Sequence, residues 1–381
     1  MALAIGSASE RRPAWPAEWG EVAVGMLATG LMTLTDNISD GNTAIDVPYP
    51  VMMQRALDRL TAMCLAAGVD PPRSAMDLIG WAGLPFRQWP LQLHSDGMDV
   101  DERLLVGGRP SRECVEWAVL GSGDVEAEIR ERRLMNAVLD KCRARNRADV
   151  YVAFRRLLVE CPAMSERELL KQLGRPELTL LAHELRSAYR PAPPETLVGG
   201  FAEVCGGCGN LRTLDAHGRR GCREWDCPDP HSVRTQLTAA EGVVWLAREF
   251  RMFVTAPGRP EIRIAKAIER ALKKERVKVH LWPGYDSCDL LPEGLAWPAD
   301  VKSWANPVRL ARRLTEKPFR PPEGSERAFI VIAQEQVRGR EHYVRTVRQH
   351  CEWLKRSRHI EVVTERAYIQ RVVARLREGK E

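Results

Sequence analysis

The sequence has no apolar run of the roughly 18–20 residues that a membrane-spanning helix requires, so we expect no membrane span. Its first residues, MALAIGSASERRPAWP, also lack the basic start and the sustained apolar stretch of a secretory signal. A cytoplasmic location is therefore expected, and in that reducing compartment the ten cysteines need not form disulfides. With 381 residues, 44% hydrophobic and 28% charged, the chain has the length and composition of a soluble protein with two or three domains.

Positive charge is unevenly distributed along the chain. Residues 231–381 carry 30 Lys and Arg against 19 Asp and Glu, whereas residues 1–230 carry 27 against 32. A basic C-terminal part suggests a polyanionic partner such as a nucleic acid, and an acidic N-terminal part suggests a protein-facing role. A solvated helical surface would explain the charge equally well. A chemical motif is therefore needed to distinguish the two explanations.

Hydrophobic periodicity indicates an α+β protein with several domains. Residues 1–50 have the turn chemistry of an irregular segment. From Val51 to about residue 190, apolar residues recur at the 3–4 spacing of helices. The composition of RPAPPETLVGG (190–200) predicts a linker. Three domains are expected, a mainly helical N-terminal domain, a zinc ribbon and a mixed α/β/α domain, over residues 1–195, 196–235 and 236–381.

The C-terminal part changes from a helical to a mixed pattern. Helices are predicted over 237–250 and over 259–275, the second with Pro260 in its first turn. Asn306-Pro307 predicts the cap and start of a later helix. From the second helix onward the order α-β-β-β-α-β-α-β-α fits a small mixed sheet flanked by helices. The expected strands are 277–282, 286–291, 296–305, 327–334 and 359–365, and the later helices include 341–357.

Four cysteines lie close together in the sequence: Cys205, Cys208, Cys222 and Cys227. They form a C-x2-C pair and a C-x4-C pair separated by thirteen residues, the spacing of a tetrahedral thiolate site for structural Zn²⁺. Neighbouring glycines permit the tight backbone turns that such a site needs. The alternatives are a redox pair or unliganded thiols, and His217 and His231 are spare donors.

An acid and a lysine two positions apart lie in LWPGYDSCDLLPEGLAWPADVKSWANP (281–307). Asp300 and Lys302 are predicted to share one face of a strand, while Val301 points into apolar packing. Asp289, on the preceding strand, would reach the same metal ion. Two carboxylates and the Val301 carbonyl suit an octahedral Mg²⁺ or Mn²⁺. Such an ion would polarise a scissile phosphate and activate water, and Lys302 would balance the developing charge.

Several assignments in this set stay open. A third acid is expected from the preceding helix, and Glu261 and Glu269 are equal candidates. Asp286 is the rival of Asp289, although its surroundings are typical of a turn. The alternative for the whole set is a surface ion pair across a hairpin.

Asp289, Asp300 and Lys302, with the predicted strand order, resemble the PD-(D/E)xK restriction-endonuclease-like superfamily in its D-x-K form, over about residues 237–365. The zinc ribbon followed by this segment more narrowly resembles the nuclease subunit encoded beside prokaryotic PIWI-RE proteins, which are Argonaute-like, and a helicase. The resemblance implies a Mg²⁺-dependent DNA endonuclease acting as the effector of a bacterial defence system against phage or plasmid DNA. Asp stands where Glu is commoner before x-Lys, and the proline expected before the first acid is absent.

Three functions are therefore considered. They are a metal-dependent DNA endonuclease, a catalytically inactive nuclease-like adaptor that binds DNA in a helicase/Argonaute-like complex, and an RNA-directed nuclease. The intact acid–acid–lysine set favours the first over the second. Metal-assisted hydrolysis treats DNA and RNA alike, so the sequence leaves the nucleic acid open.

Overall fold

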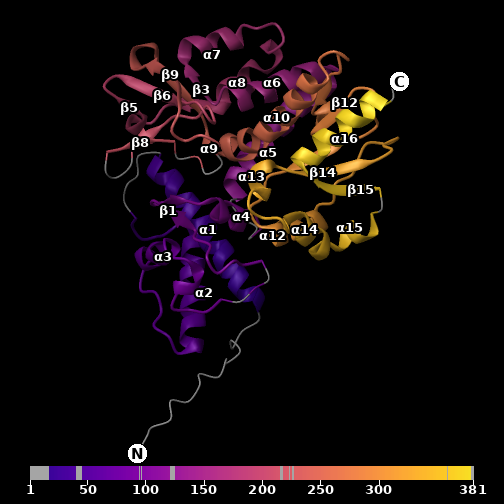
Figure 1. The fold of residues 1–381 in the computed structure, drawn as a ribbon. Helices are drawn as coiled ribbons and strands as arrows, with labels where there is room; N and C mark the ends of the chain where they lie inside the picture. The colour runs from indigo at the N-terminus through magenta and orange to yellow at the C-terminus, as the bar shows by residue number, and fades with distance from the viewer. Residues whose placement is uncertain are drawn as a thin grey trace, which may run out of the picture. The chain divides into compact units, whose positions relative to one another are not determined.

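The computed structural model describes residues 17–39, 45–93, 95, 97–120, 125–214, 218–222, 224, 227–357 and 359–378. Helices and small sheets occur together, as the α+β prediction requires (Figure 1). The chain separates into two compact units, residues 1–124 and 125–381. The three-domain division expected from the sequence stays a prediction. Within the described residues, no helix combines the length and the apolar character that a membrane span demands.

The first unit is mainly helical. Its first helix corrects the expectation of an irregular segment over residues 1–50, because α1 covers Ala17–Ser39. Leu27 and Leu31 are buried one helical turn apart on α1. A Cβ at Gly30 would lie 2.7 Å from the Met53 nitrogen of α2, so glycine permits the close approach of the two helices. The other elements are α2 (Val51–Ala67), α3 (Ala75–Ala82), η1 (Phe86–Gln88), β1 (Leu105–Val106), β2 (Arg109–Pro110) and α4 (Arg112–Leu120).

The second unit begins with helices that support a small sheet. Ser165 caps one of these helices by accepting a hydrogen bond from the Glu168 N–H at 3.2 Å. The helices are α5 (Val125–Ala144), α6 (Ala148–Glu160), α7 (Glu166–Leu173), η2 (Thr179–Leu181) and α8 (Ala182–Ala188). The sheet has the order β3-β10-β4, with β3 (Ala163–Ser165), β4 (Tyr189–Pro191) and β10 (Val243–Leu246).

This sheet overturns two expectations. The helix predicted over 237–250 is wrong, because this segment contains the end of a strand, a 3-10 turn η4 (Ala239–Glu241), β10 and the short helix α9 (Arg248–Phe250). The buried run Val243–Leu246 pairs on both sides, with β3 and with β4. The linker predicted over 190–200 is also partly wrong, because it contains the end of β4, η3 (Pro194–Thr196) and β5 (Leu197–Val198).

The cysteine segment forms two antiparallel sheets. The larger has the order β5-β6-β9, in which β6 is Phe201–Cys205 and β9 is Val233–Thr238. The smaller pairs β7 (Thr213–Leu214) with β8 (Arg220–Gly221). Short strands joined by tight turns are what a ribbon without a large apolar core of its own permits.

The C-terminal part has the predicted five strands in one sheet, β11-β12-β13-β14-β15, with the short helices α11 (Pro283–Asp286) and α13 (Gln334–Val337) added between the predicted elements. The strand expected over 286–291 is largely wrong, because Asp286 ends α11 and β12 begins only at Leu290. The pairs from β11 to β13 are antiparallel, and β13, β14 and β15 run parallel. The strands are β11 (Val279–Leu281), β12 (Leu290–Pro292), β13 (Ala299–Lys302), β14 (Ala328–Ile332) and β15 (Ile360–Thr364).

The helices of this part begin with a π-helical turn, η5 (Arg251–Thr255), which leads into α10 (Ala256–Ala271). Because α10 begins at Ala256, Pro260 lies inside the helix and not in its first turn, contrary to expectation. The helix predicted over 341–357 is interrupted at Cys351. Asn306 caps α12 as expected, accepting hydrogen bonds from the N–H groups of residues 308 and 309. The remaining helices are α12 (Pro307–Glu316), α14 (Tyr343–His350), α15 (Glu352–Arg356) and α16 (Glu365–Glu378).

Helices cover both faces of this sheet. In Figure 1, α16 lies on one side of β14 and β15, and α12, α14 and α15 lie on the other. Val301 and Phe329 face the core shared with α10 and α16, whereas Ile330 packs against the core formed with α12 and α14. Because side chains alternate along a strand, Asp300 and Lys302 lie on the face opposite to Val301.

Candidate functional site

Asp289 lies where β12 and β13 diverge. These two strands share one register pair, Leu290 with Ala299, and the Asp289 N–H donates to the Ala299 carbonyl at 3.0 Å. Beyond that point the Val301 N–H donates to Asp289 Oδ2 at 2.6 Å. The carboxylate thus takes the place of a ladder acceptor and is fixed at the opening between the strands.

Asp300 and Lys302 form a direct ion pair on β13. Lys302 Nζ lies 2.6 Å from Asp300 Oδ1, and their side chains are 16% and 27% exposed for Asp300 and Lys302 respectively. Burial alone would lower the pKa of Lys302, but the carboxylates of Asp300 and Asp289 outweigh burial and raise it. The lysine therefore keeps its charge. The predicted strand geometry is present, while the catalytic roles of these residues stay predictions.

Of the two helix acids, Glu261 lies near Asp289 and Glu269 does not. Glu261, on α10, has a side chain only 2% exposed, and it accepts hydrogen bonds from Trp282 Nε1 and from Arg155 Nη2, the latter at 3.3 Å. Burial raises the pKa of Glu261 to about 7, although the Arg155 guanidinium opposes this shift. Glu269 instead accepts the Val279 N–H at 3.1 Å, at the start of β11.

Burial also dominates the electrostatics of Asp289. It raises the pKa of Asp289 well above the ordinary range, and the nearby carboxylates of Glu261 and Asp300 raise it further. Lys302 and Arg155 act in the opposite direction. Carboxylates that burial and mutual repulsion push toward protonation are groups whose charged forms a bound cation would stabilise.

The turn between β11 and β12 has an unusual backbone. Trp282, Gly284, Tyr285 and Asp286 have φ values of 50°, 59°, 59° and 74°. Non-glycine residues rarely adopt this left-handed region, so the turn is held there by its surroundings. The Asp286 carboxylate contacts Arg155 Nη1 and accepts from the Tyr151 hydroxyl at 3.1 Å. Asp286 therefore joins the Arg155 contacts, and Asp289 lies closer to the Asp300–Lys302 pair.

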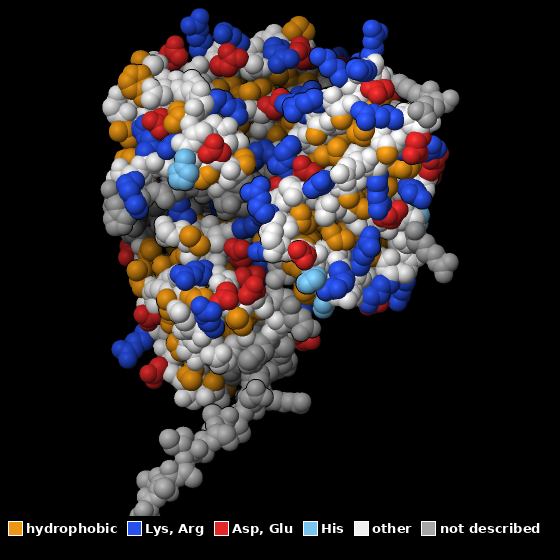
Figure 2. Space-filling view, in the orientation of Figure 1, with side chains coloured by type: hydrophobic (Ala, Val, Ile, Leu, Met, Phe, Trp, Pro, Cys, Tyr) orange, Lys and Arg blue, Asp and Glu red, His pale blue; other side chains and the backbone are white. Residues whose placement is uncertain are grey.

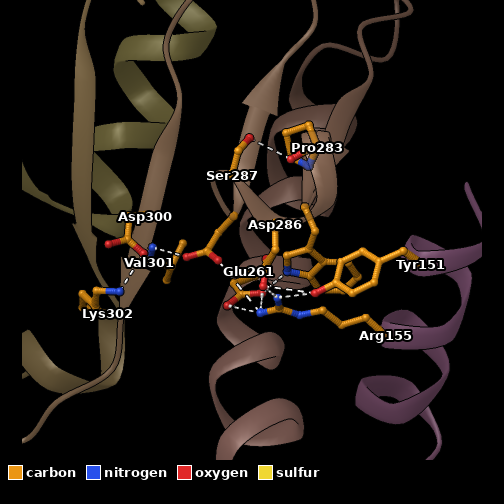
Figure 3. Close-up of polar contacts among 11 residues, drawn as sticks. Tyr151, Arg155, Glu261, Pro283, Asp286, Ser287, Asp300, Val301 and Lys302 are labelled. Carbon is orange, nitrogen blue, oxygen red and sulfur yellow. Dashed lines mark hydrogen bonds and ion pairs between the residues drawn. The ribbon is translucent and has the colours of Figure 1, made fainter. Parts of the chain in front are cut away.

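Arg155 is the residue of this region that sequence reasoning missed. It comes from α6 and contacts Glu261 and Asp286 (Figure 3). It also lies 4.0 Å from Asp289 Oδ1. Its guanidinium carbon lies 4.6 Å from the centre of the Trp282 ring, a cation–π distance. One sequence signal could have found it, because Arg155 interrupts the apolar stripe of α6, one turn after Tyr151.

The donor chemistry of the acids fits a hard divalent cation. Carboxylate oxygens of Asp289 and Asp300 are the ligands that Mg²⁺ and Mn²⁺ prefer. A bound ion would supply Lewis acidity toward a phosphate oxygen. Among the residues that the structure describes, only the four cysteines bring at least three ligand atoms within 4.8 Å of one another. The acids are therefore less tightly gathered than the thiols.

The four cysteines form a compact thiol site. Their sulfurs all lie within 4.8 Å of one another, with Cys205 and Cys227 3.5 Å apart and Cys208 and Cys222 3.4 Å apart. Tetrahedral zinc with Zn–S bonds of about 2.3 Å would separate its sulfurs by about 3.8 Å. The described cysteines form no disulfide. This donor set could bind a zinc ion.

Neighbouring residues hold the thiol site in shape. Buried Asn210 donates to the Cys208 sulfur at 3.7 Å and accepts from Trp245 Nε1 at 3.0 Å. Hydrogen bonds from the Cys208 and Cys222 thiols lower the pKa of Cys227 to about 5, which favours one thiolate in the site. His231 is exposed and outside the thiol group, and His217 lies outside the described residues.

Basic and acidic side chains are mixed on the visible face of the second unit, residues 125–381, where Figure 2 shows Lys and Arg interspersed with Asp and Glu. Arg309 of α12 is fully buried. The side chain of Arg309 therefore lies in the protein interior and adds no positive charge to the surface.

Two family models match the chain. Residues 23–165 match the family described as pPIWI_RE three-gene island domain Y. Residues 258–380 match the family described as REase associating with pPIWI_RE. No curated protein and no solved structure matches the chain. The second match runs from residue 258, inside α10, past the end of α16 and includes Glu261, Asp289, Asp300 and Lys302.

Proposed function

The chain belongs, over residues 258–380, to the family of restriction-endonuclease-like proteins associating with pPIWI_RE, and on this premise we propose that it is a metal-dependent DNA endonuclease. The resemblance seen in the sequence is confirmed by this match. The proposed reaction is hydrolysis of a phosphodiester bond, and the proposed role is that of an effector in a bacterial defence system against phage or plasmid DNA.

The observation that supports this proposal is the arrangement of Asp289, Asp300 and Lys302. Lys302 and Asp300 share one face of β13, and Asp289 is fixed beside them through the Val301 N–H. Two carboxylates can hold a metal ion that activates water, and an adjacent ammonium can stabilise charge that develops on a phosphate. Residues of a surface ion pair would not need to be buried to this extent, with the Asp289 side chain only 13% exposed.

Each residue has a proposed role. Asp289 and Asp300, with the Val301 carbonyl, would hold Mg²⁺ or Mn²⁺, which would polarise the phosphate and lower the pKa of a bound water. Lys302 keeps its charge next to these carboxylates and would stabilise negative charge developing on the phosphate. Glu261 would support these residues without contacting the ion directly, because both of its oxygens already accept hydrogen bonds from Arg155 or Trp282.

The four cysteines are proposed to bind one structural zinc ion. The supporting observation is their mutual sulfur spacing, close to that of tetrahedral Zn–thiolate coordination. The ribbon has only short strands around it, so the ion would supply much of its stability.

Cleavage assays with variants test the proposal. The full chain is incubated with plasmid, single-stranded DNA and RNA, each with Mg²⁺ or Mn²⁺. We expect cleavage of DNA by the wild type and by Lys274→Ala, an exposed control, and none by Asp300→Ala or Lys302→Ala. Equal cleavage by all four proteins would reveal a contaminant and refute the assignment.

A second candidate function is that of a non-catalytic adaptor that binds DNA, and the contacts of the acids favour it. Asp300 is engaged by Lys302, Glu261 is engaged by Arg155, and the acids do not converge as closely as the thiols. Tight DNA binding without cleavage, with either cation, would favour the adaptor. Cleavage of RNA alone would favour the RNA-directed nuclease.

Both family descriptions support association with a PIWI-RE protein. We propose such a protein, which is Argonaute-like, and a helicase as partners in addition to DNA. Co-expression followed by size-exclusion chromatography tests this, because a stable partner should move the chain to an earlier elution volume.

A further inference from the structure

Arg155 stands among three carboxylates in the nuclease centre. Its terminal nitrogens contact Asp286 and Glu261, and they lie 4.0 Å from Asp289 Oδ1. The whole arginine is only 8% exposed. Figure 3 shows its side chain extending from α6 toward Glu261 and Asp286, with Asp300 and Lys302 on the other side of the opening. Carboxylates placed around one cation are also what a divalent metal ion takes as ligands.

The guanidinium is a permanent charge. Arginine does not lose its proton in proteins, so Arg155 cannot adapt to burial by becoming neutral. Its Nε is buried without a hydrogen-bond partner among the described residues. Among the described residues, the polar contacts of its side chain are made by the two terminal nitrogens toward the acids and Tyr151. Its position is thus determined by the carboxylates.

The net charge of the ionised side chains in this centre matches one divalent ion. Four acids, Glu261, Asp286, Asp289 and Asp300, surround two basic side chains, Arg155 and Lys302. Burial raises the pKa of Glu261 and Asp289, and a bound cation would stabilise their ionised forms; in that ionised state the six groups sum to −2, which one divalent ion neutralises. Without Arg155 the sum is −3, and the vacated position is bordered by the carboxylates of residues 261, 286 and 289.

We propose that Arg155 occupies the position of a second metal ion, so that the chain binds one divalent cation in this centre and not two. This inference rests on the proposed nuclease function. Arg155 is a positioning residue, since it holds Glu261 and Asp286 and leaves Asp289 and Asp300 for the ion. It also joins the two family segments, because α6 lies within residues 23–165 and the acids lie within residues 258–380.

Ion counting tests the proposal independently of cleavage. The full chain, purified with zinc present, is titrated with Mn²⁺ and followed by calorimetry and by the electron paramagnetic resonance of free Mn²⁺. We expect one Mn²⁺ per chain in the wild type and two in Arg155→Met, which keeps a long unbranched side chain but no charge.

Three further variants act as matched controls. Arg156→Met removes the neighbouring arginine, whose side chain is 44% exposed and contacts Glu160, and should still bind one ion. Arg155→Lys keeps the charge and should also bind one. The double variant Arg155→Met/Glu261→Gln restores the sum of −2 and should return the count to one.

The outcomes separate this inference from the nuclease proposal. One Mn²⁺ in both the wild type and Arg155→Met, or two in both, would overturn the role of Arg155 and leave the nuclease centre standing. No Mn²⁺ in the wild type would overturn both. If Arg155→Met is unstable without metal, Mn²⁺ should raise its melting temperature more than that of the wild type. A variant that stays unfolded at every Mn²⁺ concentration would also overturn the inference.

Discussion

Replacing Gly207 with alanine should weaken zinc binding at the cysteine site. A Cβ at this position would lie 2.6 Å from the Asp229 carbonyl oxygen, 2.7 Å from the Asp229 nitrogen and 2.8 Å from the Cys227 sulfur. Two of these atoms are backbone and the third is a proposed zinc ligand. None can swing aside like the end of a flexible side chain, so the ribbon must shift around the ion.

The size of the effect follows from the cost of overpacking. One additional carbon in a tightly packed site typically costs about 1–3 kcal/mol. If this strain falls on the zinc-bound state, affinity for zinc should drop about 5- to 150-fold. For a unit of this size, the same strain should lower the melting temperature by about 2–12 °C.

Gly221→Ala is the matched control. Gly221 lies in β8, next to Cys222, and a Cβ there would meet no atom of the described residues within 4 Å. Zinc content per chain, competition with a chromogenic chelator and thermal unfolding would be measured for both variants and the wild type. We expect full zinc occupancy and wild-type melting for Gly221→Ala. The same result for Gly207→Ala would refute the packing argument, and a zinc-free wild type would refute the site itself.

Three other predictions concern the proposed nuclease region. Asp289→Asn keeps an oxygen that accepts the Val301 N–H but loses the charge, so calorimetry should give an Mn²⁺ affinity lower by at least about 10-fold with little change in melting; unchanged affinity would remove Asp289 as a ligand. Trp282→Phe deletes a donor to buried Glu261 and should cost about 1.5–3 kcal/mol in urea unfolding, whereas no loss would mean that the indole contact does not contribute. Phe329→Ala leaves a cavity in the sheet core and should cost about 3–5 kcal/mol by the same measurement; a loss below about 1 kcal/mol would contradict the packing described.

Much of the C-terminal fold could be predicted because its signals are local. Alternating apolar residues identify β11, β13 and β15 within a few positions of their bounds, and a continuous apolar run identifies β14. Asn306 identifies the start of α12. The cysteine spacing likewise predicted a compact thiol group. In each case, residues close in sequence carry the whole pattern.

Segments whose partners lie far along the chain were not predictable in this way. The run VVWL of β10 fits a buried helix or a buried strand by periodicity, and its pairing with β3, almost eighty residues earlier, decides for the strand. The choice between Glu261 and Glu269 also depends on contacts with residues that are distant in sequence. Both lie on α10, and only packing against Trp282 and Arg155 selects the first.

The sequence by itself therefore determined the thiol group, the order of strands in the C-terminal sheet and the shared face of Asp300 and Lys302. Local spacing and strand geometry suffice for each of these. Only the tertiary structure decided that Asp289 closes the opening between β12 and β13, and that a buried arginine from α6 enters the same centre. Such contacts depend on which distant surfaces bury each other, and no local pattern encodes the position of a charge that its partners elsewhere in the fold stabilise.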